Sequence, residues 1–177
     1  NYHSLESLIK KTRLDLLINC AAMANVDNCE SQPEEAQRVN AEMPGALAAL
    51  SKKKGIQFIH ISTDAVFDGK MGDYTEEDNP HPLSVYARTK LEGERIVSAE
   101  YPEAIIARVN FYGFSLGGKR SLAEFFLNNL KAGSSVNGFV DVMFCPLYAT
   151  DLIDALMRMI DKELKGLKGW NKTYSFS

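Results

Sequence analysis

Short apolar segments alternate with helical segments along most of this chain, and this alternation restricts its fold more than any other feature. Three segments predict strands: DLLINCAA at Asp15–Ala22, IQFIHIS at Ile56–Ser62 and AIIARV at Ala104–Val109. The first has no charge after Asp15, which is typical of a strand buried on both faces. Strand, helix, strand order favours βαβ units and a parallel sheet. We therefore predict an α/β fold.

The helical segments differ in length and regularity. A long one, Glu34–Gly55, ends at a glycine, which is a common helix stop, while its Pro44 and Gly45 predict a kink or a break. A loop is predicted from 63 to about 83, followed by a helix over about 84–100. Further along, the pattern predicts helices over 5–11, 122–131 and 150–164, an extended stretch over 135–142, and a last strand over 173–177.

Composition excludes several classes of protein. The chain has 177 residues and a net charge of −3, so its charge gives no sign of the basic face that nucleic-acid binding needs. No apolar run approaches the roughly 18 residues that span a bilayer. The three cysteines and three histidines show no metal-ligand spacing, and His60 is interpreted as a strand residue. We expect a reduced, cytoplasmic protein without a metal, a membrane span or a nucleic-acid partner.

Ligands of open parallel sheets bind at the carboxyl ends of the strands. Three short groups fall there: Ala21-Ala22-Met23, Ser62-Thr63-Asp64 and Asn110-Phe111-Tyr112-Gly113. The helix that carries Tyr86 and Lys90 begins between the second and third strands. Small residues, hydroxyl groups and this Tyr/Lys pair are therefore predicted to share one edge of the sheet.

Tyr86 and Lys90 lie one helical turn apart, on one face of their helix. The pair alone could be a surface coincidence. A phenol has a pKa of about 10, and a nearby positive charge can lower it by about 1 to 3. Tyr86 could then give a proton to a carbonyl oxygen that becomes an alkoxide, and Thr63 could donate a second hydrogen bond. A hydride would have to come from a cofactor.

Five stretches resemble the dTDP-4-dehydrorhamnose reductase family of the extended short-chain dehydrogenase/reductase superfamily, in order and spacing. They are INCAAMANVDNCESQPEEAQRVN, ISTDAVFDG, YTEEDNPHPLSVYARTKLEGE, RVNFYG and PLYATDL. The resemblance implies an NAD(P)-binding Rossmann-like three-layer fold with part of a small C-terminal substrate domain. Residues 1–177 would form the partial Rossmann-like domain, with about 111–147 and the C-terminal end serving substrate binding.

The resemblance also implies residue roles for an NAD(P)H-dependent reductase of a 4-keto nucleotide sugar. The catalytic residues would be Tyr86 as general acid, Lys90 and Thr63. The cofactor would contact Ala21, Ala22, Ser62, Tyr86, Lys90 and Val109. The nucleotide-sugar substrate would contact Thr63, Asp64, Val66, Phe67, Asn110 and Phe111. NADPH is favoured over NADH by resemblance only, and a homodimer is possible.

Simpler interpretations of some residues remain open. Ala21 and Ala22 could serve packing only, and Asp64 could cap a turn, where Asp is favoured. Asn40 closes the sequence RVN, and the resemblance implies that it braces a neighbouring strand.

The sequence departs from the family's pattern in two places. No glycine-rich turn follows an opening strand, although such a turn normally holds the pyrophosphate of a dinucleotide. We therefore expect a fragment that lacks the N-terminal turn and the C-terminal end, and the choice between NAD and NADP cannot be read from it. The second departure is RVNFYG, one residue shorter than the common version, which leaves the placement of Asn110 and Phe111 uncertain by one position.

Two other functions fit the same motifs. The methionine adenosyltransferase regulatory subunit resembles this chain and keeps similar motifs, so a non-catalytic NADP-binding regulatory subunit is one alternative. A nucleotide-sugar epimerase or dehydratase of the superfamily is another, because Asp64 follows Thr63 as an acidic residue does in dehydratases. The segment STDAVFDG favours the reductase.

Overall fold

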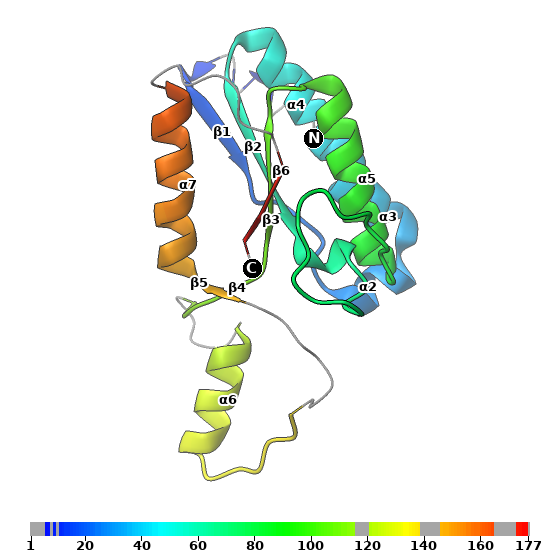
Figure 1. Ribbon diagram of the computed structural model, residues 1–177, viewed down its shortest axis with the longest axis vertical. Helices are drawn as coiled ribbons and strands as arrows, with labels where there is room; N and C mark the ends of the chain where they lie inside the picture. The colour runs from blue at the N-terminus through cyan, green and yellow to red at the C-terminus, as the bar shows by residue number, and fades with distance from the viewer. Residues whose placement is uncertain are drawn as a thin grey trace. The chain divides into compact units, whose positions relative to one another are not determined.

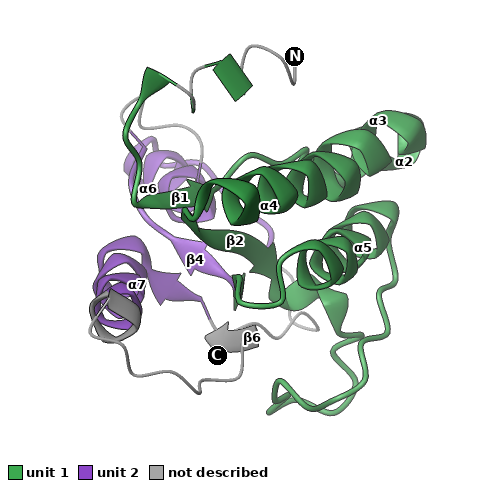
Figure 2. Cartoon of the chain, turned by 90° about the horizontal axis from the view of Figure 1, so that it is seen from above, with its two compact units in different colours: residues 1–108, 171–175 green, residues 109–170, 176–177 purple. Residues whose placement is uncertain are grey.

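The structure is a computed structural model that describes residues 6–7, 9, 11–115, 121–138, 146–164 and 173–176, with the surroundings of side chains described up to residue 160. The chain divides into two compact units, which Figure 2 shows in green and purple. The first unit comprises residues 1–108 and 171–175, and the second comprises residues 109–170 and 176–177. Each unit is described here by itself.

Four of the described strands form one sheet in the order β1-β2-β3-β6 (Figure 1). Their bounds are β1 Leu16–Asn19, β2 Gln57–Thr63, β3 Ile105–Val109 and β6 Thr173–Phe176. Strands β1 and β2 are parallel, with Leu16 opposite Gln57 and Asn19 opposite His60. The predicted α/β fold with a parallel sheet is therefore confirmed, and the last predicted strand joins this sheet beside β3.

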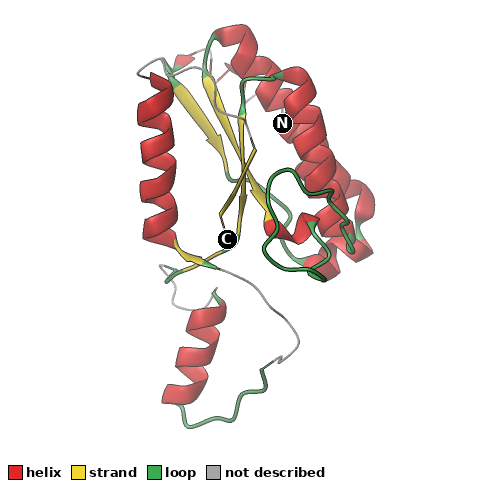
Figure 3. Cartoon of the chain, in the orientation of Figure 1, coloured by secondary structure: helices red, strands yellow, loops and turns green. Residues whose placement is uncertain are grey.

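Helices of the first unit pack on this sheet, and Figure 3 shows α4 and α5 in red along the yellow strands. Both α4 and α5 contact β2 and each other. The helices and helical turns of the first unit are α2 Val26–Ser31, α3 Pro33–Gln37, η1 Arg38–Glu42, α4 Met43–Lys54, η2 Asp64–Val66 and α5 Val85–Glu100. Residues 6, 7, 9 and 11 are also helical, and the rest of the helix predicted over 5–11 lies outside the described residues.

The predicted break in the long helix is confirmed, and it takes the form of a π-helical turn. Helix α3 passes into the π turn η1 at Arg38, and α4 resumes at Met43 with Pro44 in its first turn. A proline lacks the backbone N–H that a regular helix would use there. Helix α4 ends at Gly55, whose φ of 67° is the left-handed conformation typical of a helix C-terminus.

The expectation that the first strand is buried on both faces is wrong. Strand β1 covers four residues, and its Ile18 side chain is 40% exposed. Among the described strands, β1 stands at one end of the sheet, with β2 as its neighbour. Composition alone cannot distinguish a central apolar strand from one at an edge.

The core of the first unit lies between the sheet and helices α4 and α5. One cluster joins both helices to the strands through Leu47, Ala48, Phe58, Val97, Ala104 and Ile106. Helix α5 approaches the π turn closely at Gly93, where an added Cβ would collide with the Asn40 carbonyl oxygen. Burial of these apolar side chains is the main stabilising term for a unit of this kind.

Asn40 braces the segment after β1, as the resemblance implied. Its Oδ1 accepts a hydrogen bond from the Met23 backbone N–H at 2.8 Å. Its Nδ2 donates to the Met23 carbonyl oxygen and to Thr89 Oγ1, each at 3.1 Å. Asn40 is fully buried, so one side chain fixes the turn after β1 against helix α5.

Asn40→Ala is expected to lower the free energy of unfolding by about 2 kcal/mol or more, because it leaves buried polar groups of Met23 and Thr89 without partners. Urea unfolding of the variant beside wild type measures this change. The control is Asn79→Ala in the exposed loop, expected to change stability by about 0.5 kcal/mol or less. Equal, small losses in both variants would contradict the bracing role.

The second unit contains helices and a second small sheet. Its helices are α6 Leu122–Lys131 and α7 Ala149–Leu164, close to the predicted bounds. Two parallel strands, β4 Phe111–Tyr112 and β5 Leu147–Tyr148, were not predicted. In the stretch predicted to be extended, residues 135–138 form no strand, and 139–142 lie outside the described residues.

Candidate active site

Thr63 and the Tyr86/Lys90 pair lie in the first unit, on β2 and α5. Thr63 ends β2, and its Oγ1 accepts a hydrogen bond from the Ala65 backbone N–H at 3.2 Å, which caps the short helix η2. Ser84 caps helix α5 by accepting from the Ala87 N–H at 3.1 Å. Because α5 packs on β2, its first two turns face the carboxyl end of that strand.

The structure brings the Tyr86 phenol and the Thr63 hydroxyl together. The phenol lies near enough to Thr63 for the Thr63 side chain to influence its pKa, and Tyr86 is half-buried while Thr63 is buried. Burial raises the pKa of the Tyr86 phenol, the Thr63 hydrogen bond opposes this change, and the negative charge of Asp64 adds to it. Tyr86 therefore keeps its proton at neutral pH, as a proton donor must.

The expectation that Lys90 lowers the pKa of Tyr86 stays a prediction, and in this structure burial of the phenol raises that pKa. Lys90 is only 1% exposed. Its Nζ donates to the Ile61 carbonyl oxygen at 2.7 Å and lies 3.4 Å from Nε2 of His60. Burial lowers the pKa of Lys90 to about 8, which still leaves its amine mostly protonated at neutral pH.

His60 and Asn19 are buried polar residues beside Lys90 that the sequence analysis did not assign to the site. His60 is fully buried, and its Nδ1 lies 3.1 Å from Nδ2 of Asn19, which is 4% exposed. Burial lowers the pKa of His60 to about 3, with a smaller effect from Lys90. These two residues could have been noticed in the sequence, because they are polar residues at inward-facing positions of two adjacent apolar strands.

The residues predicted to contact cofactor in the first unit differ in their surroundings. Ala21 and Ala22 are exposed in the turn after β1, where their small side chains leave the backbone open to a ligand. Ser62 is buried, and its hydroxyl donates to Glu94. The side chains of the two alanines are therefore accessible to a cofactor. Because the Ser62 side chain is buried, a contact between Ser62 and the cofactor would have to involve the Ser62 backbone.

Glu94 and Arg108 form a buried ion pair beneath the site. Arg108 Nε donates to Glu94 Oε1 and Oε2 at 3.1 and 3.2 Å, and Arg108 Nη2 donates to Oε2 at 2.8 Å. Their side chains are 5% and 7% exposed, in that order. Since Glu94 also accepts from Ser62, the pair fixes the end of β2, where Thr63 lies.

The residues after Thr63 pack mainly against one another. Val66 and Phe67 are buried in a cluster with Leu91, and the Tyr74 ring stacks on Phe67 with centroids 4.5 Å apart. Asp64 is half-buried and accepts from Thr63 Oγ1 at 3.3 Å. The Arg108 guanidinium also lies over the Phe67 ring, 5.1 Å from its centroid. A substrate contact of Val66 or Phe67 remains a prediction.

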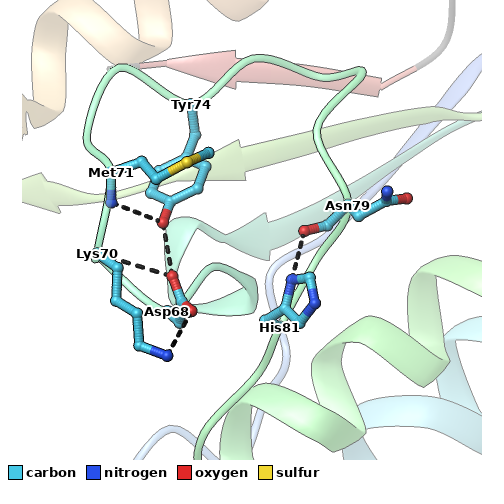
Figure 4. A network of polar contacts seen from close by, with 6 residues as sticks. All are labelled: Asp68, Lys70, Met71, Tyr74, Asn79 and His81. Atoms are coloured by element: carbon cyan, nitrogen blue, oxygen red, sulfur yellow. Dashed lines mark hydrogen bonds and ion pairs between the residues drawn. The ribbon is translucent and has the colours of Figure 1, made fainter.

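A polar network holds the loop that follows (Figure 4). Tyr74 donates from its hydroxyl to Asp68 Oδ1 at 2.6 Å and accepts from the Met71 N–H at 3.2 Å. The Tyr74 hydrogen bond, with help from Lys70, lowers the pKa of Asp68 to about 2. His81 bonds the Asn79 carbonyl oxygen at 2.9 Å. The loop beyond the site is therefore tied down by its own side chains.

The second unit contains a mainly apolar pocket of about 660 Å³. Asn110 and Phe111, which were predicted to contact substrate, line it, and Val109 is buried. Asn110 also accepts the Leu147 N–H at 2.9 Å through its backbone oxygen. Tyr112 and Gly113, which the sequence analysis placed at the same strand end, also line it, whereas Phe114, Ser115, Ser121, Leu122 and Phe126 were not singled out from the sequence.

Comparison with known protein families identifies the family of this chain. The sequence model of one family, described as RmlD substrate binding domain, matches residues 1–177. The chain belongs to this family.

Relatives of this RmlD-family chain include named reductases. A probable low-salt glycan biosynthesis reductase of Haloferax volcanii is 40% identical over 163 residues, which cover 90% of this chain and 54% of that protein. A dTDP-4-dehydrorhamnose reductase of Mycobacterium tuberculosis is 39% identical over 161 residues, covering 86% of this chain and 51% of that protein. The chain thus spans about half the length of the curated relatives that it matches.

Solved structures agree with the fold of this RmlD-family chain. The dTDP-4-dehydrorhamnose reductase of Bacillus anthracis, solved with NADP, has a TM-score of 0.89 at 26% identity and covers all of this chain and 61% of its own. The predicted Rossmann-like fold is therefore confirmed.

A different relative is the methionine adenosyltransferase 2 subunit beta of Rattus norvegicus. It is 31% identical over 175 residues, which cover 95% of this chain and 52% of that protein.

Two further results concern other ligands. Within the described residues, no helix is both long and apolar enough to cross a membrane. The same residues contain no cluster of His, Cys, Asp or Glu side chains suited to a metal ion.

Proposed function

We propose that this protein is an NAD(P)H-dependent reductase of a 4-keto nucleotide sugar. The observation that carries the proposal is the gathering of Tyr86, Thr63 and the buried Lys90 at the end of β2, where Lys90 Nζ donates to the Ile61 carbonyl oxygen at 2.7 Å. The names of the reductase relatives and the NADP in a solved relative support this choice of substrate and cofactor. NADPH is the favoured cofactor.

The bound cofactor would supply a hydride to the carbonyl carbon. Tyr86 gives its phenolic proton to the oxygen that becomes the alcohol, and its raised pKa keeps that proton available at neutral pH. Thr63 donates a hydrogen bond to the same oxygen as charge develops there. Lys90 and the open Ala21–Ala22 turn hold the cofactor.

The remaining contacts belong to the same proposal. Ser62 and Val109 border the cofactor, while Asp64, Val66, Phe67, Asn110 and Phe111 border the sugar substrate. The first unit acts as the Rossmann-like part, and about 111–147 with the C-terminal end serves substrate binding. The pocket beside Asn110 and Phe111 supports this division. A cytoplasmic location and a homodimer complete the proposal.

The test is oxidation of NADPH and of NADH by the purified full-length protein with dTDP-4-dehydrorhamnose, followed by absorbance of the reduced nicotinamide. We expect substrate-dependent oxidation and a product that carries a new hydroxyl group at the 4 position. A related 4-keto nucleotide sugar serves as the second substrate. Absence of oxidation with every such sugar, in a protein that binds NADPH, would overturn the reductase proposal.

A second candidate is a non-catalytic regulatory subunit, which the 31% identity to a methionine adenosyltransferase subunit beta supports. It predicts NADP binding without turnover and co-purification with a methionine adenosyltransferase catalytic subunit. The oxidation assay and the co-purification together separate the two candidates.

A further inference from the structure

One carboxylate of the second unit joins two residues that line the pocket. Glu124 lies in the first turn of α6 and is only 3% exposed. Its Oε1 accepts from the Ser115 backbone N–H at 2.6 Å, and its Oε2 accepts from the Ser121 backbone N–H at 2.9 Å. The Ser115 hydroxyl donates to the same carboxylate, 3.1 Å from Oε1 and 3.0 Å from Oε2. These bonds offset the cost of burying a carboxylate, to which the proposed chemistry gives no role.

Capping of helix α6 accounts for only part of this arrangement. Ser121 Oγ accepts from the Glu124 backbone N–H at 3.1 Å, and the Glu124 side chain accepts from the Ser121 N–H, which completes a capping box. A capping box needs no contact with Ser115, which lies nine residues before Glu124 and outside the helix. Glu124 therefore also ties the segment after β4 to the start of α6.

Both bonded serines line the pocket of about 660 Å³, together with the aromatic side chains of Phe111, Tyr112 and Phe126. Small-molecule sites in proteins have volumes of this order, and aromatic walls stack well on a flat ring such as a nucleobase. The three proposed catalytic residues belong to the first unit, and none of them is among the described residues that line the pocket. The pocket is therefore suited to a part of the substrate that does not react.

We propose that Glu124 is a positioning residue for this pocket: its carboxylate holds Ser115 and Ser121 in place and so determines the affinity for the nucleotide part of the substrate. The choice of ligand rests on the proposed function. Glu124 acts through the two serines and the pocket wall that they form, and it takes no part in the transfer of hydride or proton.

The two backbone donors require two acceptor oxygens. A backbone N–H only donates, and the Ser115 and Ser121 N–H groups are bonded to different oxygens of the carboxylate. A glutamine side chain has the same shape, but one of its two terminal atoms is an NH₂ group that donates. In Glu124→Gln, one of the two N–H groups therefore faces a donor whichever way the amide turns. This variant is expected to release one of the two serines without changing the size of the side chain.

The first test is amide hydrogen exchange at Ser115 and Ser121 in the full-length protein, followed by NMR. We expect both amides to be protected in wild type, and at least one of them to exchange about 10-fold faster or more in Glu124→Gln. Asp78→Asn is the matched control, because Asp78 accepts from the backbone N–H and the hydroxyl of Thr75 in the exposed loop of the first unit. It should leave both serine amides unchanged. Two unprotected amides in wild type, or unchanged exchange in Glu124→Gln, would contradict the proposal.

The second test is binding of dTDP, the part of the proposed substrate that does not react, measured by titration calorimetry. The Kd for dTDP is expected to rise by about 10-fold or more in Glu124→Gln, because a backbone donor at the pocket loses its partner. The Kd of Asp78→Asn should equal the wild-type value. A wild-type protein that does not bind dTDP, or a folded Glu124→Gln variant with an unchanged Kd, would overturn the proposal.

Steady-state kinetics separate positioning from a merely structural role. KM for dTDP-4-dehydrorhamnose should rise with the Kd for dTDP while kcat stays at the wild-type value, because a contact with a non-reacting group contributes equally before and during the reaction. A variant that only loses folded molecules would show a lower kcat with unchanged KM and Kd, and this result would exclude a positioning role.

A milder variant keeps the proposal testable if Glu124→Gln does not fold. Ser115→Ala removes only the hydroxyl that bonds both carboxylate oxygens, and it leaves the capping box of α6 intact. Its Kd for dTDP should rise by about threefold. An unchanged Kd would count against the role of Glu124.

Amide exchange and dTDP binding need no turnover, so their results are separate from those of the oxidation assay. A protein that binds dTDP in a Glu124-dependent way but oxidises no NADPH would overturn the reductase proposal alone. A protein that oxidises NADPH but binds dTDP equally well with and without the Glu124 carboxylate would overturn the role of Glu124 alone.

Discussion

Tyr86→Phe is expected to lower kcat for NADPH-dependent reduction by about 10²-fold or more, the usual contribution of a positioned general acid. The variant keeps the ring and its packing but removes the proton that the new alcohol requires. Steady-state kinetics of wild type and variant measure the effect. NADPH affinity, measured by fluorescence titration, should change far less than kcat, because the phenol acts on the reacting carbonyl.

Tyr101→Phe is the matched control for this experiment. Tyr101 follows the last residue of helix α5 and packs on the cluster that includes Phe58 and Val97. The same substitution there removes a hydroxyl at the other end of the same helix, so kcat should stay at the wild-type value. If Tyr86→Phe retained most of the wild-type kcat, Tyr86 could not be the proton donor.

Glu94→Ala is expected to lower the free energy of unfolding by about 3–5 kcal/mol, because it leaves the buried Arg108 charge without its partner. Urea unfolding measures the loss. Glu92→Ala, two residues before Glu94 and on the exposed side of the helix, removes a pair with Arg95 at 3.4 Å whose side chains are 41% and 68% exposed. This control should cost at most about 1 kcal/mol.

A double variant identifies the source of the loss. Glu94→Leu combined with Arg108→Met removes both charges and keeps much of the buried volume. It should recover most of the stability lost in Glu94→Ala, because replacing a whole buried pair by apolar residues is often neutral. A double variant as unstable as Glu94→Ala would show that the loss comes from packing rather than from an uncompensated charge.

The elements with a strong pattern could be predicted from the sequence. Periodicity and helix caps predict the apolar segments of β2 and β3 and the bounds of α5 and α6. The π turn at Arg38–Glu42 could be expected as a break before Pro44, but not as a π turn. Strands β4 and β5 have two residues each, too few for any periodicity.

The proximity of Tyr86, Lys90 and Thr63 could be predicted from the sequence, and their electrostatics less so. The spacing of Tyr86 and Lys90 placed both on one helical face, and the end of β2 placed Thr63 near them. Their pKa values depend on burial, which no spacing reports. His60 and Asn19 were assigned to the strands alone, because their mutual contact depends on the register between β1 and β2, which pairs these two residues.

The parallel pairing of β4 with β5 also has a consequence for evolution. Phe111 lies opposite Leu147, so the chain leaves this ladder at Tyr112 and returns to it at Leu147. Lengthening a segment whose two ends are already joined costs little, since the entropy of closing a loop rises only slowly with its length. Natural variants can therefore differ in the length and sequence of the segment between these two strands, which changes the residues that line the pocket. The helix that carries Tyr86 and Lys90 can stay the same.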